Sequence, residues 1–108
     1  MSKKFLLQAK FNAYGVSGLL KSGGIARRQV ARKMISDLGG NLESIYFTLN
    51  SDEAYAIFEI PDELTAAAIS LNVEATGMAS INLIQLFTPS DIDSAASILV
   101  DYRPPGQE

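Results

Sequence analysis

The sequence predicts an α+β fold in which two helices cover one face of a four-stranded antiparallel sheet. Two observations carry this prediction. Strand-like and helix-like stretches follow one another in the order β-α-β-β-α-β, and clusters of Gly, Pro, Asn and Asp separate them. The chain has 108 residues, of which 47% are apolar, so it can bury one core, and we expect a single domain over residues 1–108.

The first stretch predicts a strand over residues 4–11, because apolar and polar residues alternate there. One side of this strand would carry Phe5, Leu7, Ala9 and Phe11, and the other side Leu6, Gln8 and Lys10. Residues 12–24 hold four glycines and two serines. That composition predicts a loop, with at most one helical turn over residues 16–21.

The clearest helix is expected over residues 25–38. Val30, Met34 and Leu38 recur at every fourth position, with Ala31 and Ile35 beside them, and together they form one apolar stripe. The pair Gly39-Gly40 follows, and glycine commonly ends a helix because it accepts a left-handed backbone. We therefore expect this stripe to face the core.

Residues 42–49 and 54–60 predict a hairpin around the turn Asn50-Ser51-Asp52-Glu53. The register that puts only apolar residues on one face pairs Leu49 with Ala54, Phe47 with Ala56 and Ile45 with Phe58. A shift of one residue would mix apolar and polar residues, so we expect this register. The predicted core then consists of Phe5, Leu7, Val30, Met34, Leu38, Ile45, Phe47, Ala56 and Phe58.

The remaining elements complete the fold. Asp62 is a candidate N-cap for a second helix over residues 63–76, which Gly77 would end. A fourth strand is expected over residues 78–87, and Ser90-Asp91 would cap a short helix that runs through Leu99. Residues 100–108 contain a proline pair and predict an extended tail. The complete order of elements is that of the ferredoxin-like fold.

The composition narrows the chemistry. The chain has no cysteine and no histidine, which excludes thiol nucleophiles and thiolate metal sites and removes the commonest general base. Neighbouring carboxylates occur at Asp52-Glu53, Asp62-Glu63 and Asp91/Asp93, where turn chemistry and helix starts account for them. We therefore expect no catalytic residue, no metal site and no cofactor.

Charge and hydropathy bear on partners and location. The net charge of −3 argues against nucleic acid as a partner. The strands also lack the pattern of basic and aromatic residues by which RNA-recognition domains bind RNA. The apolar run of residues 5–7 is short, and Gln8 and Lys10 interrupt it. It therefore predicts neither a signal peptide nor a membrane span. We expect a cytoplasmic protein with no membrane partner.

Two helices would leave the second face of the sheet uncovered. That face would carry Leu6, Gln8, Lys10, Tyr46, Thr48, Tyr55, Ile57 and Glu59. The mixture is too apolar for open water and too polar for a dry core. We expect the chain to cover this face by forming a homodimer or a higher homo-oligomer. In the alternative, the interface also encloses a ligand pocket, and Tyr46, Tyr55 and Glu59 are the candidate pocket or interface residues.

Basic residues cluster at the start of the first predicted helix. The candidate anion-binding residues are Lys21, Ser22, Gly23, Gly24, Arg27 and Arg28. Unpaired backbone N–H groups and the helix dipole favour an anion at a helix N-terminus, and glycines let it approach the backbone. The spacing is not that of a P-loop. In the alternative, the glycines only shape a loop, and the cations are solvated or pair with carboxylates such as Glu53, Glu59 or Asp62.

Several stretches together resemble one known family. They are Gly18-Leu19-Leu20-Lys21-Ser22-Gly23-Gly24 with Ala26-Arg27-Arg28, Leu38-Gly39-Gly40, Tyr46-Phe47, Leu71-Asn72-Val73 with Ala75-Thr76-Gly77, and Tyr102-Arg103-Pro104-Pro105-Gly106. This pattern resembles the GYD-domain family over nearly the whole chain. The family takes its name from a Gly-Tyr-Asp signature at the hairpin turn, where this chain has Asn50-Ser51-Asp52-Glu53.

The resemblance implies a small bacterial protein of ferredoxin-like fold, akin to dimeric α/β barrels, and assigns no activity. We therefore expect a homo-oligomeric binding or structural module. The alternative is a protein, or an enzyme of the dimeric α/β-barrel type, that binds a small anionic metabolite.

Overall fold

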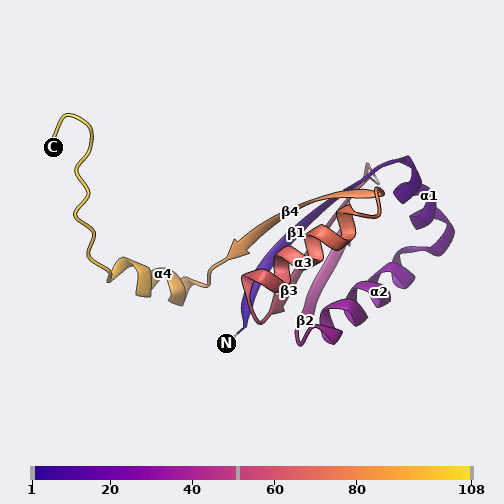
Figure 1. The fold of residues 1–108 in the computed structure, drawn as a ribbon, viewed down its shortest axis with the longest axis horizontal. Helices are drawn as coiled ribbons and strands as arrows, with labels where there is room; N and C mark the ends of the chain where they lie inside the picture. The colour runs from indigo at the N-terminus through magenta and orange to yellow at the C-terminus, as the bar shows by residue number, and fades with distance from the viewer. Residues whose placement is uncertain (1, 51, 108) are drawn as a thin grey trace.

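The computed structural model describes residues 2–50 and 52–107 (Figure 1). The described chain forms four strands and four helices in the order β-α-α-β-β-α-β-α. They are β1 (Lys3–Phe11), α1 (Ala13–Ser22), α2 (Gly24–Asp37), β2 (Asn41–Phe47), β3 (Glu53–Ile60), α3 (Glu63–Glu74), β4 (Ala79–Leu86) and α4 (Pro89–Ala96).

The four strands form one antiparallel sheet in the order β2-β3-β1-β4. The first strand is therefore central, and its residue Leu7 lies opposite Ala56 of β3 and Leu83 of β4. Helices α2 and α3 pack on one face of this sheet, and we call the other face the open face (Figure 1). The predicted α+β class with a single four-stranded antiparallel sheet is confirmed.

The core lies between the sheet and the two helices. Its most deeply buried large side chains are Phe58, Ile60 and Ile35. The rings of Phe5 and Phe58 stack with centroids 6.0 Å apart. Of the predicted core, Phe5, Ala56 and Phe58 are buried, Leu7, Met34 and Ile45 are partly buried against them, and Phe47 is half-buried.

The prediction was wrong for Val30 and Leu38, which are 54% and 38% exposed. The helix is turned so that Ile35, at the side of the predicted stripe, points into the core instead. Val30 and Leu38 face the space between α2 and α3, because those two helices do not close on each other.

The predicted loop over residues 12–24 is also wrong, since most of it is helix α1. The Asn12 side chain caps this helix by accepting a hydrogen bond from the Gly15 N–H group at 3.0 Å. Glycine is required at position 15, because a Cβ atom there would lie 2.5 Å from the Met78 carbonyl oxygen. The helix ends at Gly23, which has a φ of 85° and turns the chain directly into α2.

The hairpin register differs from the prediction by two residues. Phe47 lies opposite Ala54 and Ile45 opposite Ala56, with an irregularity between Leu42 and Ser44. The strand β3 begins at Glu53, because Glu53 also pairs with β1, and this moves the four-residue loop one position toward the N-terminus. A two-residue shift leaves each side chain on its predicted face. Part of the predicted turn signature, Ser51, lies outside the described residues.

The second half of the chain follows the prediction more closely. Asp62 caps α3 as expected, accepting a hydrogen bond from the Thr65 N–H group at 2.8 Å. The cap of α4 is Thr88, however, and the predicted cap residues Ser90 and Asp91 lie inside the helix. Pro89 suits the first helical position because its missing N–H group would be unpaired there anyway. Residues 100–107 form the extended, exposed tail that was predicted.

Candidate functional site

An apolar cavity of about 100 Å³ lies between α2 and the sheet. We call it the inner cavity. Every residue that lines it is apolar except Arg27: Leu7, Ala9, Phe11, Ala31, Met34, Ile35, Leu42, Ile45, Phe47, Ala54, Ala56, Phe58, Val73 and Ile81. The cavity therefore has one charged group.

Small residues on the two central strands create this space. Ala9 of β1 lies opposite Ala54 of β3, and Ala56 follows two positions along on the same face. Larger side chains at these positions would fill the gap beneath α2. On the helix, Arg27, Ala31 and Met34 line the cavity together because positions spaced by three or four residues share one side of a helix.

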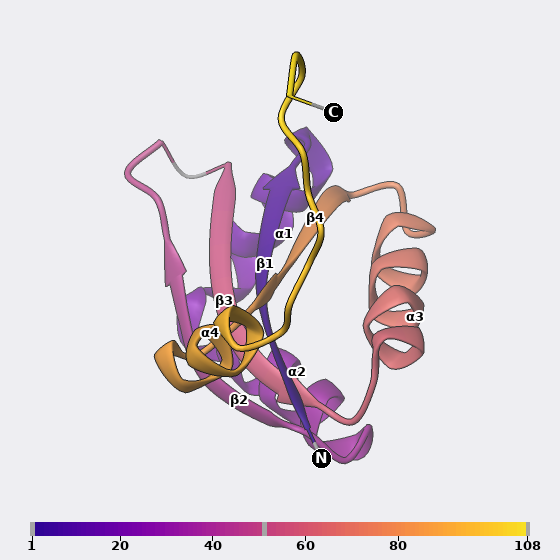
Figure 2. The same ribbon diagram turned by 90° about the vertical axis from the view of Figure 1, so that its left-hand side faces the viewer.

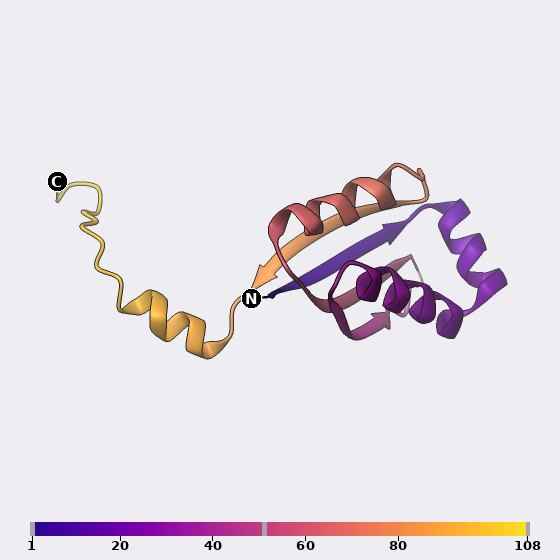
Figure 3. The ribbon, with the colours of Figure 1, turned by 60° about the horizontal axis from the view of Figure 1, so that its bottom comes forward.

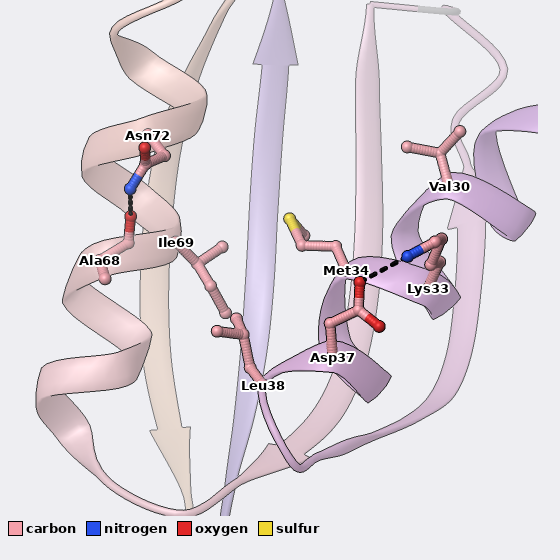
Figure 4. A pocket seen from close by; sticks show the side chains of 8 residues that line it. All are labelled: Val30, Lys33, Met34, Asp37, Leu38, Ala68, Ile69 and Asn72. Atoms are coloured by element: carbon pink, nitrogen blue, oxygen red, sulfur yellow. Dashed lines mark hydrogen bonds and ion pairs between the residues drawn. The ribbon is translucent and has the colours of Figure 1, made fainter.

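A wider groove of about 490 Å³ lies between α2 and α3 and is shown in Figure 4. We call it the outer groove. Val30, Met34 and Leu38 line it from α2, and Ile69 and Asn72 are among the residues that line it from α3. Met34 lines the inner cavity as well, so this flexible side chain stands at the boundary between the two spaces. On the rim of the groove, Lys33 pairs with Asp37 at 2.7 Å.

The fold divides the predicted anion-binding cluster. Arg27 lines the inner cavity, whereas Arg28 points to the other side of α2 and lines a shallow hollow of about 250 Å³ beside β2, together with Arg32 and Tyr46. Lys21 and Ser22 are exposed at the end of α1.

The start of α2 lies beside the inner cavity. Gly24 packs against the ring of Phe47, since a Cβ atom on Gly24 would lie 3.5 Å from that ring. Gly23 provides no side-chain cap for the first turn. The glycine pair therefore brings the unpaired N–H groups of α2 close to a residue that lines the cavity.

In the part of the chain that the structure describes, the cations of this cluster have no carboxylate partner. Across residues 2–50 and 52–107, Lys21, Arg27 and Arg28 form none of the observed ion pairs. The carboxylates considered as their partners are engaged elsewhere. Glu53 accepts a hydrogen bond from Tyr55, Glu59 lies 3.9 Å from Lys4, and Asp62 caps α3.

The other predicted site residues lie on the open face. Tyr46 and Tyr55 are opposite each other in the β2–β3 pair. Tyr46 is 71% exposed, whereas the Tyr55 hydroxyl donates a hydrogen bond to Glu53 Oε1 at 2.8 Å. This hydrogen bond, with the negative charge of Glu53, raises the pKa of Tyr55 above its ordinary value. Tyr55 is thus a weaker acid than a free tyrosine.

Glu59 belongs to a charged group at the end of the open face. Lys4 lies 3.1 Å from Glu43 and 3.9 Å from Glu59. The sheet separates this group and the two tyrosines from Arg27. The predicted site residues therefore lie in two main regions rather than one pocket, and Arg28 and Tyr46 meet at the hollow beside β2.

The described part of the chain holds no group of three or more metal-ligating side chains placed to bind a metal ion. No helix within it is long and apolar enough to cross a membrane.

Sequence reasoning missed the lining of the inner cavity apart from Arg27. Met34 and Phe47 are predicted to be core residues and Phe11 lies on the predicted apolar side of the first strand, but the prediction assigns none of them to a cavity. The alanines at positions 9, 54 and 56 were the available signal, because three small residues on one sheet face leave room above them.

Comparison with known proteins identifies a family. No curated protein and no solved structure matches the chain. The model of the GYD domain matches residues 5–96, from β1 to the last residue of α4. That stretch includes all of the sheet except the first two residues of β1, both cavity-lining helices and every candidate site residue. The chain therefore belongs to the GYD domain family.

Proposed function

We propose that this chain is a homo-oligomeric binding module for a small carboxylate with an apolar ring or branched body. The inner cavity carries the proposal, because its walls are apolar and Arg27 is its single charged residue. A ligand of this class would place its body against the alanines and its carboxylate at Arg27.

The size of the space suits such a ligand. An apolar cavity of ~150 Å³ holds benzene in another protein, so the inner cavity of about 100 Å³ takes a branched aliphatic group as it stands and needs more room for a ring. Movement of Met34 would join it to the outer groove of about 490 Å³, a volume typical of small-molecule sites. Methionine adopts many rotamers at low cost, so it suits this role.

The charge of the site also suits a carboxylate. The guanidinium group of arginine binds a carboxylate through two parallel hydrogen bonds. Arg27 is exposed and has no carboxylate partner within residues 2–50 and 52–107, so a ligand would meet an uncompensated cation. The start of α2 at Gly23 and Gly24, with Lys21, Ser22 and Arg28 close by in the sequence, adds positive potential. Because this end of the site is exposed, we expect an affinity of ~1 μM to 1 mM that salt weakens.

Calorimetric titration tests the proposal, with benzoate as the probe and uncharged benzamide as its match. We expect benzoate to bind and benzamide to bind at least about tenfold more weakly. Arg27→Ala should remove benzoate binding, whereas Arg28→Ala, on the other side of α2, should leave it within about twofold. Ala54→Val should block the cavity and also remove binding. Equal binding of benzoate by the Arg27→Ala variant and the parent chain would refute the proposal.

Self-association is the second part of the proposal. The open face carries Tyr46, Ile57 and Ile84, and in the described chain no helix covers it, so a second copy would bury this surface. We propose a ferredoxin-like assembly of the dimeric α/β-barrel type, in the cytoplasm, with the chain as a single domain.

Sedimentation or light scattering at micromolar concentration tests the assembly. We expect a dimer or a larger species, and Tyr46→Arg should weaken it, because the variant would bury an unpaired charge at the interface. A monomer at these concentrations would refute this part alone and would leave the ligand site standing.

A further inference from the structure

Residues 87–107, which we call the C-terminal arm, lie apart from the rest of the fold. Figures 1 and 3 show α4 and the tail beyond the ends of the strands, away from α2 and α3. The radius of gyration is 17.3 Å, against ~13 Å for a compact chain of this length. Helix α4 has no buried residue.

A capping box fixes the backbone where helix α4 of the arm begins. The Thr88 hydroxyl accepts a hydrogen bond from the Asp91 N–H group at 3.0 Å, and the Asp91 carboxylate accepts one from the Thr88 N–H group at 2.8 Å. Pro89, at the first helical position, restricts the backbone further. These contacts hold the first turn of α4, so the arm begins as an ordered helix.

The arm is unusually apolar for an exposed segment. Its exposed large side chains are Phe87, Ile92, Ile98, Leu99, Val100 and Tyr102. Single exposed apolar residues are common on protein surfaces, but a consecutive apolar run such as residues 98–100 marks a surface that binds something.

The inner side of the arm is continuous with the open face. A hollow of about 550 Å³ is lined by Ile92, Ala95 and Ile98 of the arm and by Lys4, Glu59 and Leu86 at the end of the open face, among others. Figure 2 looks along the arm toward the sheet behind it. The arm and the open face together form one concave surface.

We propose that a second copy of this chain occupies this surface, so that the C-terminal arm of each copy packs on the open face of the other. The inference rests on the self-association proposed above and assigns the segment that holds the two copies together.

Charge favours a second copy as the occupant. The arm carries Asp91, Asp93 and Asp101, and its cation Arg103 lies 3.7 Å from Asp101. Asp93 forms no ion pair within the described chain, and neither does Lys10, an exposed cation on the open face. Lys10 sits at the end of β1 opposite to the arm. A two-fold axis that lies parallel to the open face and perpendicular to the strands would bring the arm of one copy to this end of the other.

The available area also suits a dimer. The arm has six large apolar side chains, each able to cover on the order of 100 Å² or more. With both arms and the surfaces beneath them counted, the contact reaches the ~1,200–2,000 Å² of a stable interface.

Disulfide trapping tests the arrangement cleanly, because the chain has no cysteine of its own. Lys10→Cys and Asp93→Cys are prepared as separate proteins, mixed and oxidised with diamide. We expect a disulfide-linked heterodimer on a non-reducing gel. A mixture of Lys10→Cys with Asp37→Cys, an exposed aspartate on α2, is the matched control and should link at most weakly. If a chain with both Lys10→Cys and Asp93→Cys links only within itself, the arm covers its own sheet and the inference fails.

A second test measures assembly directly. Leu99 is 97% exposed, so Leu99→Asp removes no contact within one chain. We expect this variant to raise the dimer dissociation constant at least about tenfold. Leu64→Asp, at an 83% exposed leucine of α3, should leave it unchanged, and benzoate binding should persist in both variants. If Tyr46→Arg dissociates the dimer and Leu99→Asp does not, self-association through the open face stands and the role of the arm is refuted.

Discussion

The two faces of the sheet are built from the same strands, and they differ in how deeply alternate side chains are buried. Along β3, Ala54, Ala56, Phe58 and Ile60 are buried beneath the helices, while the residues between them are only partly buried. The helix face thus holds the fold together. The open face contributes less to it and keeps partly exposed side chains such as Tyr46 and Ile57. In the assembly proposed above, one strand would carry stability on one side and recognition on the other.

The largest expected effect contrasts neighbouring residues on the two faces. Phe58→Ala removes a fully buried ring that stacks on Phe5 and should lower the free energy of unfolding by ~3–5 kcal/mol. Ile57→Ala, on the open face, should cost less than half as much in a chain kept monomeric by dilution. Urea unfolding measures both, and equal losses would contradict the division of roles between the two faces.

A medium effect concerns how closely the helix face is packed near the end of α2. A Cβ atom on Gly40 would lie 2.2 Å from the Glu59 carbonyl oxygen and 2.8 Å from Ile60 Cγ2. Gly40→Ala should therefore lower the free energy of unfolding by ~1–3 kcal/mol.

Gly18→Ala is the control, because nothing lies within 4 Å of the added atom. Alanine favours a helix interior, so this substitution should raise stability by ~0.5–1 kcal/mol. Substitution by alanine is thus expected to lower stability at Gly40 and to raise it at Gly18. Thermal unfolding at neutral pH measures both changes.

The smallest effect concerns the cap of α3. The hydrogen bond from the Thr65 backbone N–H group, together with one from its hydroxyl, lowers the pKa of Asp62 below its ordinary value. The ionised form is favoured in the folded chain, so this contribution is fully present above the ordinary pKa. It is lost as the pH falls from that value through the lowered one. Asp62→Asn keeps a capping oxygen without the charge and should reduce the fall in melting temperature between pH 6 and pH 3. An unchanged fall would show that Asp62 does not contribute to the acid sensitivity.

The sequence predicts on which face of the sheet each strand side chain lies better than it predicts which residue lies opposite it on the neighbouring strand. Side chains alternate with a period of two, so Phe47 and Ile45 were assigned to the correct face even though their register was wrong by two residues. What decides between such registers is the pairing of Glu53 with both flanking strands. That is a three-strand contact, which the hairpin alone does not contain.

The helix side was harder to predict for a similar reason. The stripe of Val30, Met34 and Leu38 and the buried Ile35 differ by a small rotation of α2, and tertiary packing against the sheet selects between them. The inner cavity depends on alanines from two different strands, so it emerges only when those strands are paired. Arg27 could be singled out from its place in a basic cluster, whereas its apolar surroundings could not.

The strand order has a consequence for how this chain is made. Leu7 of the first strand lies opposite Ala56 and Leu83, so both neighbours of β1 are synthesised long after it. The N-terminal strand β1 has no strand to pair with until β3 and β4 have been synthesised, so the sheet cannot form strand by strand as the chain leaves the ribosome. The sheet closes only once β4 has been released, which makes long-range closure the slow event in folding. Nascent chains that end before β4 leave an apolar edge of β1 unpaired, and they are the species that chaperones would have to protect.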